Sequence, residues 1–221
     1  MTRNALITGG SKGIGRAIKK RLEAEGVNVL SPTRSEMDLS SNASIDLYMK
    51  NLDIPVHILV NNAGINKIAL AIETSESDID ETMQVNLLAP LRIAKSILPG
   101  MVRQQFGRIV NISSIWGFVT KTGRIAYSMT KSGIIGMTRT LAVEFASHNI
   151  LINAVAPGYV NTELTRQNNT QEQIEAIKQT IPIGRLAEPE EISEIVSFFI
   201  SDKNSYVTGQ LIIVDGGYVC L

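Results

Sequence analysis

Tyr127 and Lys131 lie four residues apart in the segment Ala126-Tyr-Ser-Met-Thr-Lys131. On a helix this spacing places both side chains on one face. An ammonium group beside a phenol favours the phenolate, so Lys131 is expected to lower the pKa of Tyr127 from its usual value of about 10. Such a tyrosine can exchange a proton with an oxygen bound to carbon. The pair alone decides little, because two common residues at helical spacing usually mark a solvated face.

A glycine-rich turn near the start of the chain is the second chemical feature. The segment Asn4-Ala-Leu-Ile-Thr-Gly-Gly-Ser-Lys-Gly-Ile-Gly15 runs from a short apolar strand into four glycines. Backbone N–H groups at such a strand–turn–helix junction can bind a phosphate, helped by the helix dipole. The spacing differs from the general Gly-x-Gly-x-x-Gly fingerprint. A plain strand–helix connection is the alternative explanation for this segment.

Apolar strands alternate with helical patterns along the whole chain. The expected strands are 5–7, 27–30, 56–60, 108–112, 151–156 and 210–214, and the expected helices are 14–25, 42–51, 77–103, 124–147 and 189–201. This alternation predicts an α/β fold in which a single domain, residues 1–221, holds one doubly wound parallel sheet. The glycine turn, Asn61, Ser114 and Pro157 each follow a strand directly. They are therefore expected to converge on one crevice.

Several short motifs occur in a fixed order. They are Thr8-Gly-x-x-x-Gly-x-Gly15, Asn61-Asn-Ala-Gly64, Asn86, Ser114, Tyr127-x-x-x-Lys131 and Pro157-Gly158. Together with Asp215-Gly-Gly217, they resemble the classical short-chain dehydrogenase/reductase family, and within it the 3-oxoacyl-carrier-protein reductases. The resemblance covers nearly the whole chain. It implies a Rossmann domain that binds NAD(P) and transfers hydride between the nicotinamide and a ketone or secondary alcohol.

The resemblance also implies a role for individual residues. Tyr127 would be the general acid/base, Lys131 would lower its pKa and hold the nicotinamide ribose, and Ser114 would donate to the carbonyl oxygen. Asn86 would connect Lys131 to solvent through a water; a structural hydrogen bond bracing its helix is the alternative. No metal is expected. The expected cofactor contacts are Gly9, Ser11, Lys12, Gly13, Ile14, Gly15, Thr33, Arg34, Asp38, Leu39, Asn61, Ala63, Gly64, Tyr127, Lys131, Pro157, Gly158, Val160 and Thr162.

The connection after the second strand is shorter than the family pattern. Only Ser31-Pro-Thr-Arg-Ser-Glu-Met37 separates Leu30 from Asp38-Leu39. A parallel crossover that contains a helix needs roughly a dozen residues or more. We therefore predict that the helix after the second strand is missing and that a loop or a short edge strand takes its place.

The same segment predicts NADP(H) as the cofactor. NAD-preferring relatives carry a carboxylate near the end of the second strand. By resemblance that position is Thr33, followed by Arg34, which can bind a 2′-phosphate. Lys12 in the glycine turn adds a second cation, although either cation alone could be a solvated surface charge. Asp38 is expected on the adenine side, with a helix N-cap or a turn as its alternative role.

The substrate is less well specified. Family pockets are lined by residues after the catalytic serine and after Pro157-Gly158, which here are Trp116, Phe118, Tyr159 and 163–181. This polar stretch, within about 159–185, predicts a mobile lid suited to a polar substrate. The alternative is that its isoleucines at 174, 177 and 181 dock a surface helix. The mostly neutral segment 103–107 gives acyl carrier protein only weak support, so a 3-oxoacyl thioester and a polar or hydroxylated ketone are comparable candidates.

The bulk composition excludes other classes. The chain has 221 residues, of which 44% are hydrophobic, and its 21 basic and 21 acidic residues balance. This indicates neither a nucleic acid nor a membrane surface as a partner. The apolar stretches fall short of a membrane span, the N-terminus has no signal-peptide pattern, and the lone Cys220 fits a reduced cytoplasm.

Two expectations concern assembly. The long helices expected at 77–103 and 124–147 suggest a homo-oligomer, a dimer or a tetramer as in the family. A non-catalytic NADP-binding regulatory or assembly protein on the same fold is the alternative function. The presence of all four expected catalytic residues argues against that alternative.

Overall fold

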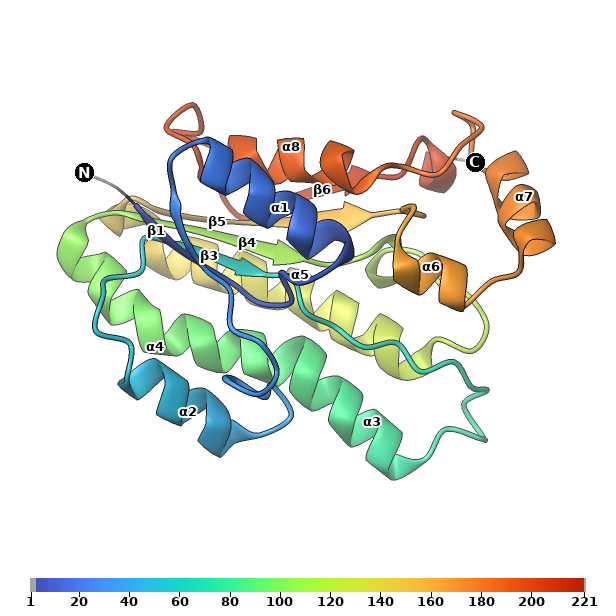
Figure 1. The fold of residues 1–221 in the computed structure, drawn as a ribbon, viewed down its shortest axis with the longest axis horizontal. Coiled ribbons are helices and arrows are strands. Elements are labelled where there is room, and N and C mark those ends of the chain that lie inside the picture. The colour runs from blue at the N-terminus through green and yellow to red at the C-terminus, as the bar shows by residue number, and fades with distance from the viewer. Residues whose placement is uncertain (1–2, 221) are drawn as a thin grey trace.

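Six parallel strands form the central sheet of the computed structural model, which describes residues 3–220 (Figure 1). Their order is β2-β1-β3-β4-β5-β6. The strands are β1 Asn4–Ile7, β2 Asn28–Leu30, β3 Ile58–Asn61, β4 Gly107–Ile112, β5 Ile150–Pro157 and β6 Leu211–Val214. Every expected strand is present. The doubly wound α/β fold predicted from the sequence is confirmed.

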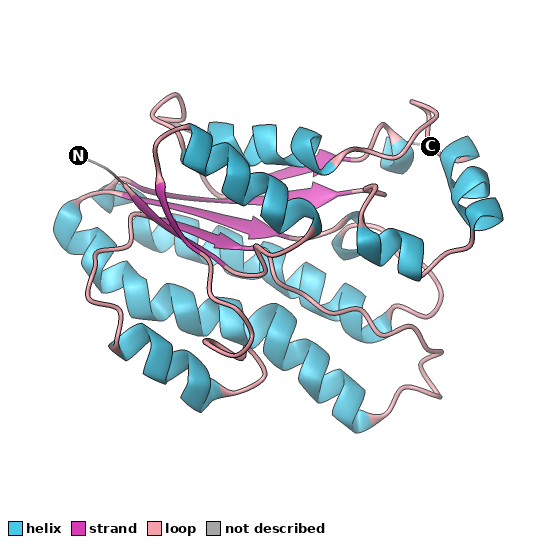
Figure 2. Ribbon diagram, viewed as in Figure 1, coloured by secondary structure: helices cyan, strands magenta, loops and turns pink. Residues whose placement is uncertain are grey.

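Helices cover both faces of the sheet (Figures 1 and 2). On one face α1 (Gly13–Ala24) packs against α8 (Pro189–Ile200). On the other face lie α4 (Ala89–Gln104) and α5 (Ile125–Phe145), with α2 (Asn42–Lys50) against α4. Short 3₁₀ turns form at Ile115–Gly117, Ala146–His148 and Tyr218–Cys220.

The alternation of side chains along each strand creates two cores. In β1, Ala5 and Ile7 face the α1 side of the sheet, whereas Leu6 faces the α4 side, and all three are fully buried. This is the period of two expected for a strand covered on both faces. It explains why the strands appear in the sequence as unbroken apolar runs.

The predicted loss of the helix after β2 is confirmed, because no helix forms between Leu30 and α2. The connection instead makes a turn in which the Met37 N–H donates to the Thr33 carbonyl over 3.0 Å. Met37 and Leu39 are buried in the core beside α4. Two apolar side chains of the loop therefore cover the sheet where the family has a helix. β2 is left as a three-residue edge strand, a length that limits unwanted pairing.

The helix expected at 77–103 is continuous but irregular. It consists of α3 (Glu76–Met83), a π-helical turn Gln84–Leu88, and α4. By length and composition Glu76–Gln104 could cross a membrane, contrary to the sequence expectation, yet 50% of its most apolar window is buried inside the molecule. Residues of α4 such as Ile93 and Met101 are fully buried in the core. Packing against the sheet accounts for the apolar character of this helix.

The stretch expected to form a lid contains two helices that the sequence did not predict. They are α6 (Glu163–Gln167) and α7 (Gln171–Gln179), and they lie beyond the carboxyl ends of the strands. Ile174 and Ile181 are buried in a small cluster with Leu186, against which Ile177 packs. These isoleucines therefore dock a surface helix. A lid function for the segment stays a proposal.

Candidate active site

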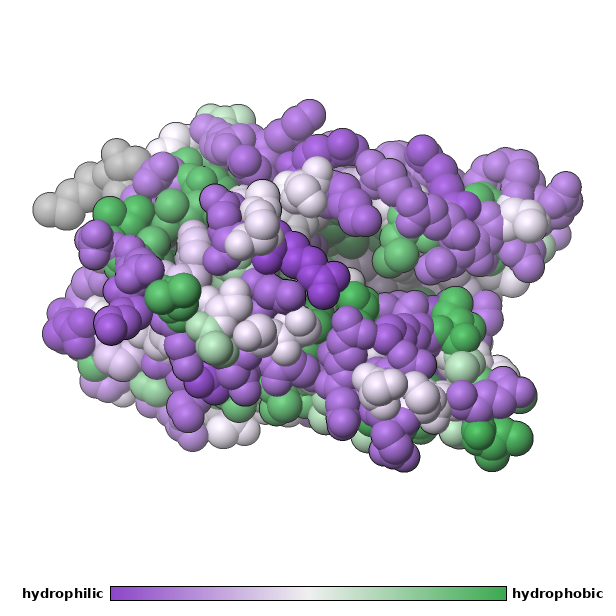
Figure 3. Space-filling model, turned by 60° about the horizontal axis from the view of Figure 1, so that its bottom comes forward, coloured by the Kyte–Doolittle hydropathy of each residue, from purple (hydrophilic) through white to green (hydrophobic). Residues whose placement is uncertain are grey.

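A cleft with a volume of about 350 Å³ opens at the carboxyl ends of the strands. It is lined by the glycine turn after β1, by Asn62–Asn66 after β3, by Ile112–Ser114 at β4 and by Pro157–Gly158 at β5. On the right of Figure 3 the surface is hollowed, with apolar atoms inside the hollow. The strand order reverses between β1 and β3, which is where ligands bind in open parallel sheets.

A second pocket of about 410 Å³ continues this cleft toward β2. The two share Gly9, Ser11 and the segment Ala63–Ile65, and the second extends to Ser31–Arg34, Asp38 and Leu39. Together they form an elongated groove from Arg34 to Tyr127. A groove that runs past the glycine turn from the end of β2 to the start of α5 fits a dinucleotide laid across the sheet edge.

The glycine turn has the geometry of an anion site. The N-cap residue of α1, Lys12, makes no side-chain cap within the described part of the chain, and the first turn of the helix holds no acidic residue, so its N–H groups can serve a ligand. The Glu163 carboxylate lies close to the first of them, the Gly13 N–H. Gly9 has φ of +68°, a conformation that favours glycine. A Cβ on Gly15 would lie 2.1 Å from the Gly9 carbonyl oxygen. Close packing inside the turn therefore requires glycine at both positions.

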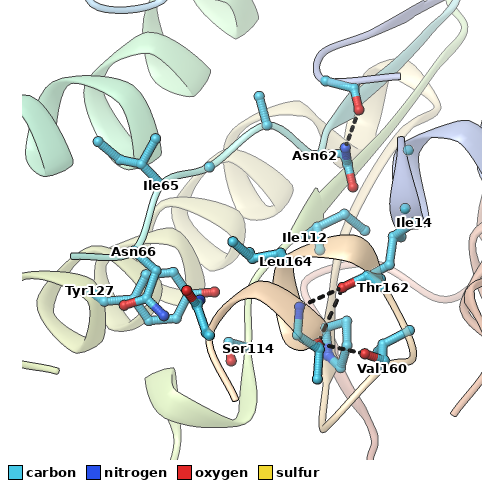
Figure 4. A pocket seen from close by; sticks show the side chains of 18 of the residues that line it. Ile14, Asn62, Ile65, Asn66, Ile112, Ser114, Tyr127, Val160, Thr162 and Leu164 are labelled. Atoms are coloured by element: carbon cyan, nitrogen blue, oxygen red, sulfur yellow. Dashed lines mark hydrogen bonds between the residues drawn. The ribbon is translucent and has the colours of Figure 1, made fainter. Parts of the chain in front are cut away.

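Asn62, rather than Asn61, secures this turn. The Asn62 Nδ2 group donates to the carbonyl oxygens of Thr8 and Gly9, both over 3.0 Å (Figure 4). Asn61 instead points into the sheet and donates to Asn111 Oδ1 over 2.8 Å, and it does not line the groove. The sequence expectation of a cofactor contact at Asn61 thus falls on a structural residue. Successive residues at a strand end face opposite ways, and the motif alone does not say which side faces the groove.

Three of the four expected catalytic side chains, those of Ser114, Tyr127 and Lys131, line the cleft. Figure 4 shows Ser114 and Tyr127 there. Tyr127 lies in the first turn of α5, and Lys131 Nζ lies 5.4 Å from the centre of its ring. Lys131 is buried and donates to the Ile112 carbonyl over 2.8 Å. Ser114 follows β4, and its hydroxyl accepts from the Trp116 N–H. The neighbouring Ser113 donates to the Lys131 carbonyl over 2.9 Å, so it anchors α5.

Burial dominates the electrostatics of this group. Burial raises the pKa of Tyr127, opposed by a polar contact with Ser114 and by the charge of Arg124. Burial also lowers the pKa of Lys131 to about 8. Burial therefore outweighs the lowering of the Tyr127 pKa expected from the sequence, and the effect of Lys131 on that pKa stays a prediction. Desolvation disfavours the charged form of both groups.

Asn86 lies in the π-helical turn and braces the chain after β3. Its Oδ1 accepts from the Ile65 N–H and its Nδ2 donates to the Ile65 carbonyl, both over 2.8 Å. A Cβ on Gly64 would lie 3.3 Å from Asn86 Oδ1 and 3.6 Å from Lys131 Nζ, so both side chains approach this glycine. The structural role weighed as the alternative is present. The proposed water connection to Lys131 stays a prediction.

The β2 end of the groove carries Arg34 and Asp38. Asp38 Oδ1 accepts from the N–H and the hydroxyl of Ser40, and these bonds hold the pKa of the Asp38 carboxyl below its usual value. Arg34 is 77% exposed and its Nε lies 3.4 Å from Asp38 Oδ2. Glu36, which sequence reasoning missed, accepts from the N–H and hydroxyl of Thr33, both over 2.8 Å.

Further expected contacts come from the segment after β5, which faces the glycine turn across the cleft. Val160 and Thr162 line the cleft, and the Thr162 hydroxyl also caps α6. Trp116, Tyr159 and Tyr218 form an edge-to-face wall with ring centres 5.6–6.0 Å apart. Phe118, an expected pocket residue, is 61% exposed and lies outside the cleft lining. Within residues 3–220 no group of three or more His, Cys, Asp or Glu could hold a metal.

Comparisons with known proteins agree with this geometry. A family model described as "Enoyl-(Acyl carrier protein) reductase" matches residues 33–219. The chain is 39% identical to the 3-oxoacyl-(acyl-carrier-protein) reductase FabG of Aquifex aeolicus over 96% of each chain. It is 36% identical to the FabG of Thermotoga maritima, over 97% of this chain and 96% of that protein.

Two solved structures superpose closely. One is described as a gluconate dehydrogenase of Agrobacterium tumefaciens, with a TM-score of 0.94, 30% identity, and coverage of 99% of this chain and 96% of that one. The other is a 4-hydroxyisoleucine dehydrogenase complexed with NADH, with a TM-score of 0.94, 27% identity and full coverage of both chains. The family model and these relatives, together with a groove that is lined by Ser114, Tyr127 and Lys131, lead to one conclusion. The chain belongs to the short-chain dehydrogenase/reductase family of oxidoreductases.

Proposed function

We propose that the protein is an NADP(H)-dependent ketoreductase that interconverts a ketone and a secondary alcohol. The observation that carries the proposal is the convergence of Ser114, Tyr127 and Lys131 at one end of a dinucleotide-sized groove. When bound there, the nicotinamide supplies or accepts the hydride at the carbonyl carbon. The phenol of Tyr127 gives its proton to the carbonyl oxygen, and the Ser114 hydroxyl donates a hydrogen bond to the same oxygen.

The groove offers groups for each part of the cofactor. The N-terminus of α1 would receive the pyrophosphate, and Gly9, Ser11 and Ala63 would border it. Asp38 and Leu39 would lie beside the adenine, while Val160 and Thr162 would lie near the nicotinamide. The buried Lys131 would donate to the nicotinamide ribose. Relatives with a nicotinamide cofactor or a reductase name support this assignment.

The preference for NADP(H) rests on the cations around the β2 end. Arg34 and Lys19 line that pocket and Lys12 lines the adjoining cleft, whereas Glu36 is turned onto Thr33 and does not line either. An arginine side chain can bind a 2′-phosphate by a charge-assisted pair. One structural neighbour was solved with NADH, so the choice between the two cofactors needs a direct measurement.

Replacing Arg34 with alanine tests this preference. The dissociation constant of NADPH is expected to rise about tenfold, since one exposed charge-assisted contact is lost, while that of NADH stays unchanged. Isothermal titration calorimetry with both cofactors gives the comparison. Arg103→Ala, an exposed arginine at the end of α4, is the matched control. Tighter binding of NADH by the wild type would contradict the assignment.

The substrate is a small-molecule carbonyl compound or alcohol. The names of the reductase relatives favour a 3-oxoacyl thioester, with acyl carrier protein as the partner. The two solved structures are named for gluconate and 4-hydroxyisoleucine, which are small polar hydroxy acids. The polar stretch 163–181 beside the cleft supports the second class, and it would act as a lid over the cytoplasmic enzyme's active site.

We also propose a homotetramer or homodimer built on the helices of the α4 and α5 face. Apolar side chains remain exposed there, including Leu88, Met129 and Val143, which are 47%, 48% and 84% exposed. Light scattering at micromolar concentration is expected to give two or four times the 24.1 kDa chain mass. Val143→Lys is expected to lower that mass, and a monomeric wild type would overturn the proposal.

A further inference from the structure

Arg124 is a charged side chain of the cleft whose guanidinium has no partner among residues 3–220. Its Nε and Nη1 atoms are buried and form no hydrogen bond among residues 3–220, and no carboxylate pairs with it there. A buried guanidinium with unsatisfied donors is unfavourable, and burial lowers the pKa of Arg124 accordingly. Such donors need an acceptor from a water, an ion or a ligand. Because Arg124 lines the cleft, a bound ligand can supply that acceptor.

The backbone holds Arg124 at the catalytic tyrosine. It occupies the N-cap position of α5, three residues before Tyr127. A parallel bridge pairs it with Ala69, and the Ala69 N–H donates to the Gly123 carbonyl over 3.3 Å. Its charge acts on both Tyr127 and Tyr159, which line the same cleft. The guanidinium therefore lies on the substrate side, away from the glycine turn.

The charges around the cleft favour an anion at this end. Glu163, the acidic residue of the cleft lining, lies near the glycine turn and pairs with Arg16 over 3.2 Å. At the tyrosine end, Lys121 Nζ donates to the Tyr159 hydroxyl over 3.2 Å, and this exposed lysine adds a second positive charge to that of Arg124. The described lining residues thus place positive charge, without a balancing carboxylate, around the wall that faces Tyr127.

We propose that Arg124 binds a carboxylate of the substrate, so that the ketone reduced at Tyr127 belongs to a short oxo acid. The inference rests on the proposed ketoreductase function and names its substrate class. Arg124 and Tyr127 line the same cleft and lie three residues apart in the chain, so a carboxylate and a carbonyl bound by them would belong to one short molecule. The planar guanidinium matches a carboxylate with two parallel hydrogen bonds. A neutral acyl thioester offers Arg124 a carbonyl oxygen but no negative charge and no two-oxygen acceptor.

Paired substrates of equal chain length test the proposal. The wild type should reduce 2-oxobutanoate or 3-oxobutanoate with at least about tenfold higher kcat/KM than the corresponding methyl ester. In Arg124→Gln the kcat/KM for the acid should fall about tenfold or more, whereas the kcat/KM for the ester should stay within a factor of about three of the wild-type value. Arg124→Lys should recover part of the loss, and Arg139→Gln, an exposed arginine on the same helix, should match the wild type. A wild-type preference for the esters, or an acid preference that survives in Arg124→Gln, overturns the inference.

A binding measurement separates this inference from the proposed function. Butanoate and methyl butanoate cannot be reduced at a ketone, so their calorimetric affinity for the cofactor-saturated protein does not depend on turnover. Butanoate should bind the wild type at least about tenfold more tightly than Arg124→Gln, with both proteins folded by circular dichroism. If butanoate binds as expected but the wild type reduces no ketone, the ketoreductase function is refuted and the anion site is retained. Equal affinity for the acid and the ester would refute the anion site itself.

Discussion

Tyr127→Phe is expected to reduce kcat for ketone reduction by about 10³-fold, because it removes the proton donor and leaves the ring in place. The raised pKa of Tyr127 keeps the phenol protonated at neutral pH, which is the form that reduction needs. The affinity for the cofactor should change little, since Lys131 and the glycine turn are untouched. Steady-state kinetics with NADPH, together with a calorimetric titration of the cofactor, gives both quantities.

The tyrosine prediction has a matched control in Tyr206→Phe. Tyr206 is 95% exposed and far from the groove lining, so this variant should keep wild-type activity. The reverse reaction adds a second check, because alcohol oxidation needs the phenolate and should accelerate as pH rises toward the raised pKa. A Tyr127→Phe enzyme that keeps more than about a tenth of the wild-type kcat would show that another group donates the proton.

Lys131→Met is expected to abolish most activity and, unusually, to stabilise the fold at neutral pH. The pKa of Lys131 falls from 10.5 to about 8 on folding, because the ammonium is buried. Below pH 8 the folded protein carries this charge at a penalty of order 3 kcal/mol, from about 1.4 kcal/mol per pKa unit. Losing the bond to the Ile112 carbonyl offsets about 1 kcal/mol of that. A net gain of about 1–2 kcal/mol in the free energy of unfolding is expected at pH 7.

The sign of this effect gives it a distinctive pH dependence. The folded-state pKa lies below the unfolded-state value, so between pH 8 and 10.5 the unfolded chain binds more protons and wild-type stability rises with pH. The difference in the free energy of unfolding between Lys131→Met and the wild type should therefore shrink over that pH range. Urea unfolding at pH 7 and pH 10 measures it, with Lys95→Met, an exposed lysine on α4, as the control. A gap that does not change with pH would contradict the buried-charge explanation.

The strands and the long helices could be predicted from the sequence because each has a strong local signal. The apolar runs of β1 and β3 and the spacing of Tyr127 and Lys131 needed no tertiary information. The missing helix after β2 followed from chain length alone, since seven residues cannot form a helical crossover. These are properties of short segments, and the fold leaves them unchanged.

The features that the sequence did not reveal depend on contacts between distant segments. The choice of Asn62 over Asn61 follows from which side of β3 faces the glycine turn. Likewise the pKa of Tyr127 depends on how deeply the ring is covered, which spacing cannot give. Arg124 was not singled out from the sequence, where it is simply the first residue of an expected helix. Its lack of a partner became visible only when the segments around Gly123 and Ala69 were brought together.

The aromatic wall has a practical consequence. The chain contains one tryptophan, and Trp116 is that residue. It is 8% exposed and touches Tyr159 and Tyr218 at the rim of the cleft. All indole emission of the native protein therefore originates in the lining of the cleft that also holds Tyr127, where a bound reduced nicotinamide is expected to quench it by energy transfer. The intrinsic fluorescence of Trp116 can therefore report occupancy of the cleft and movement of the segment 163–181, and a stopped-flow fluorimeter can follow both over time without any label.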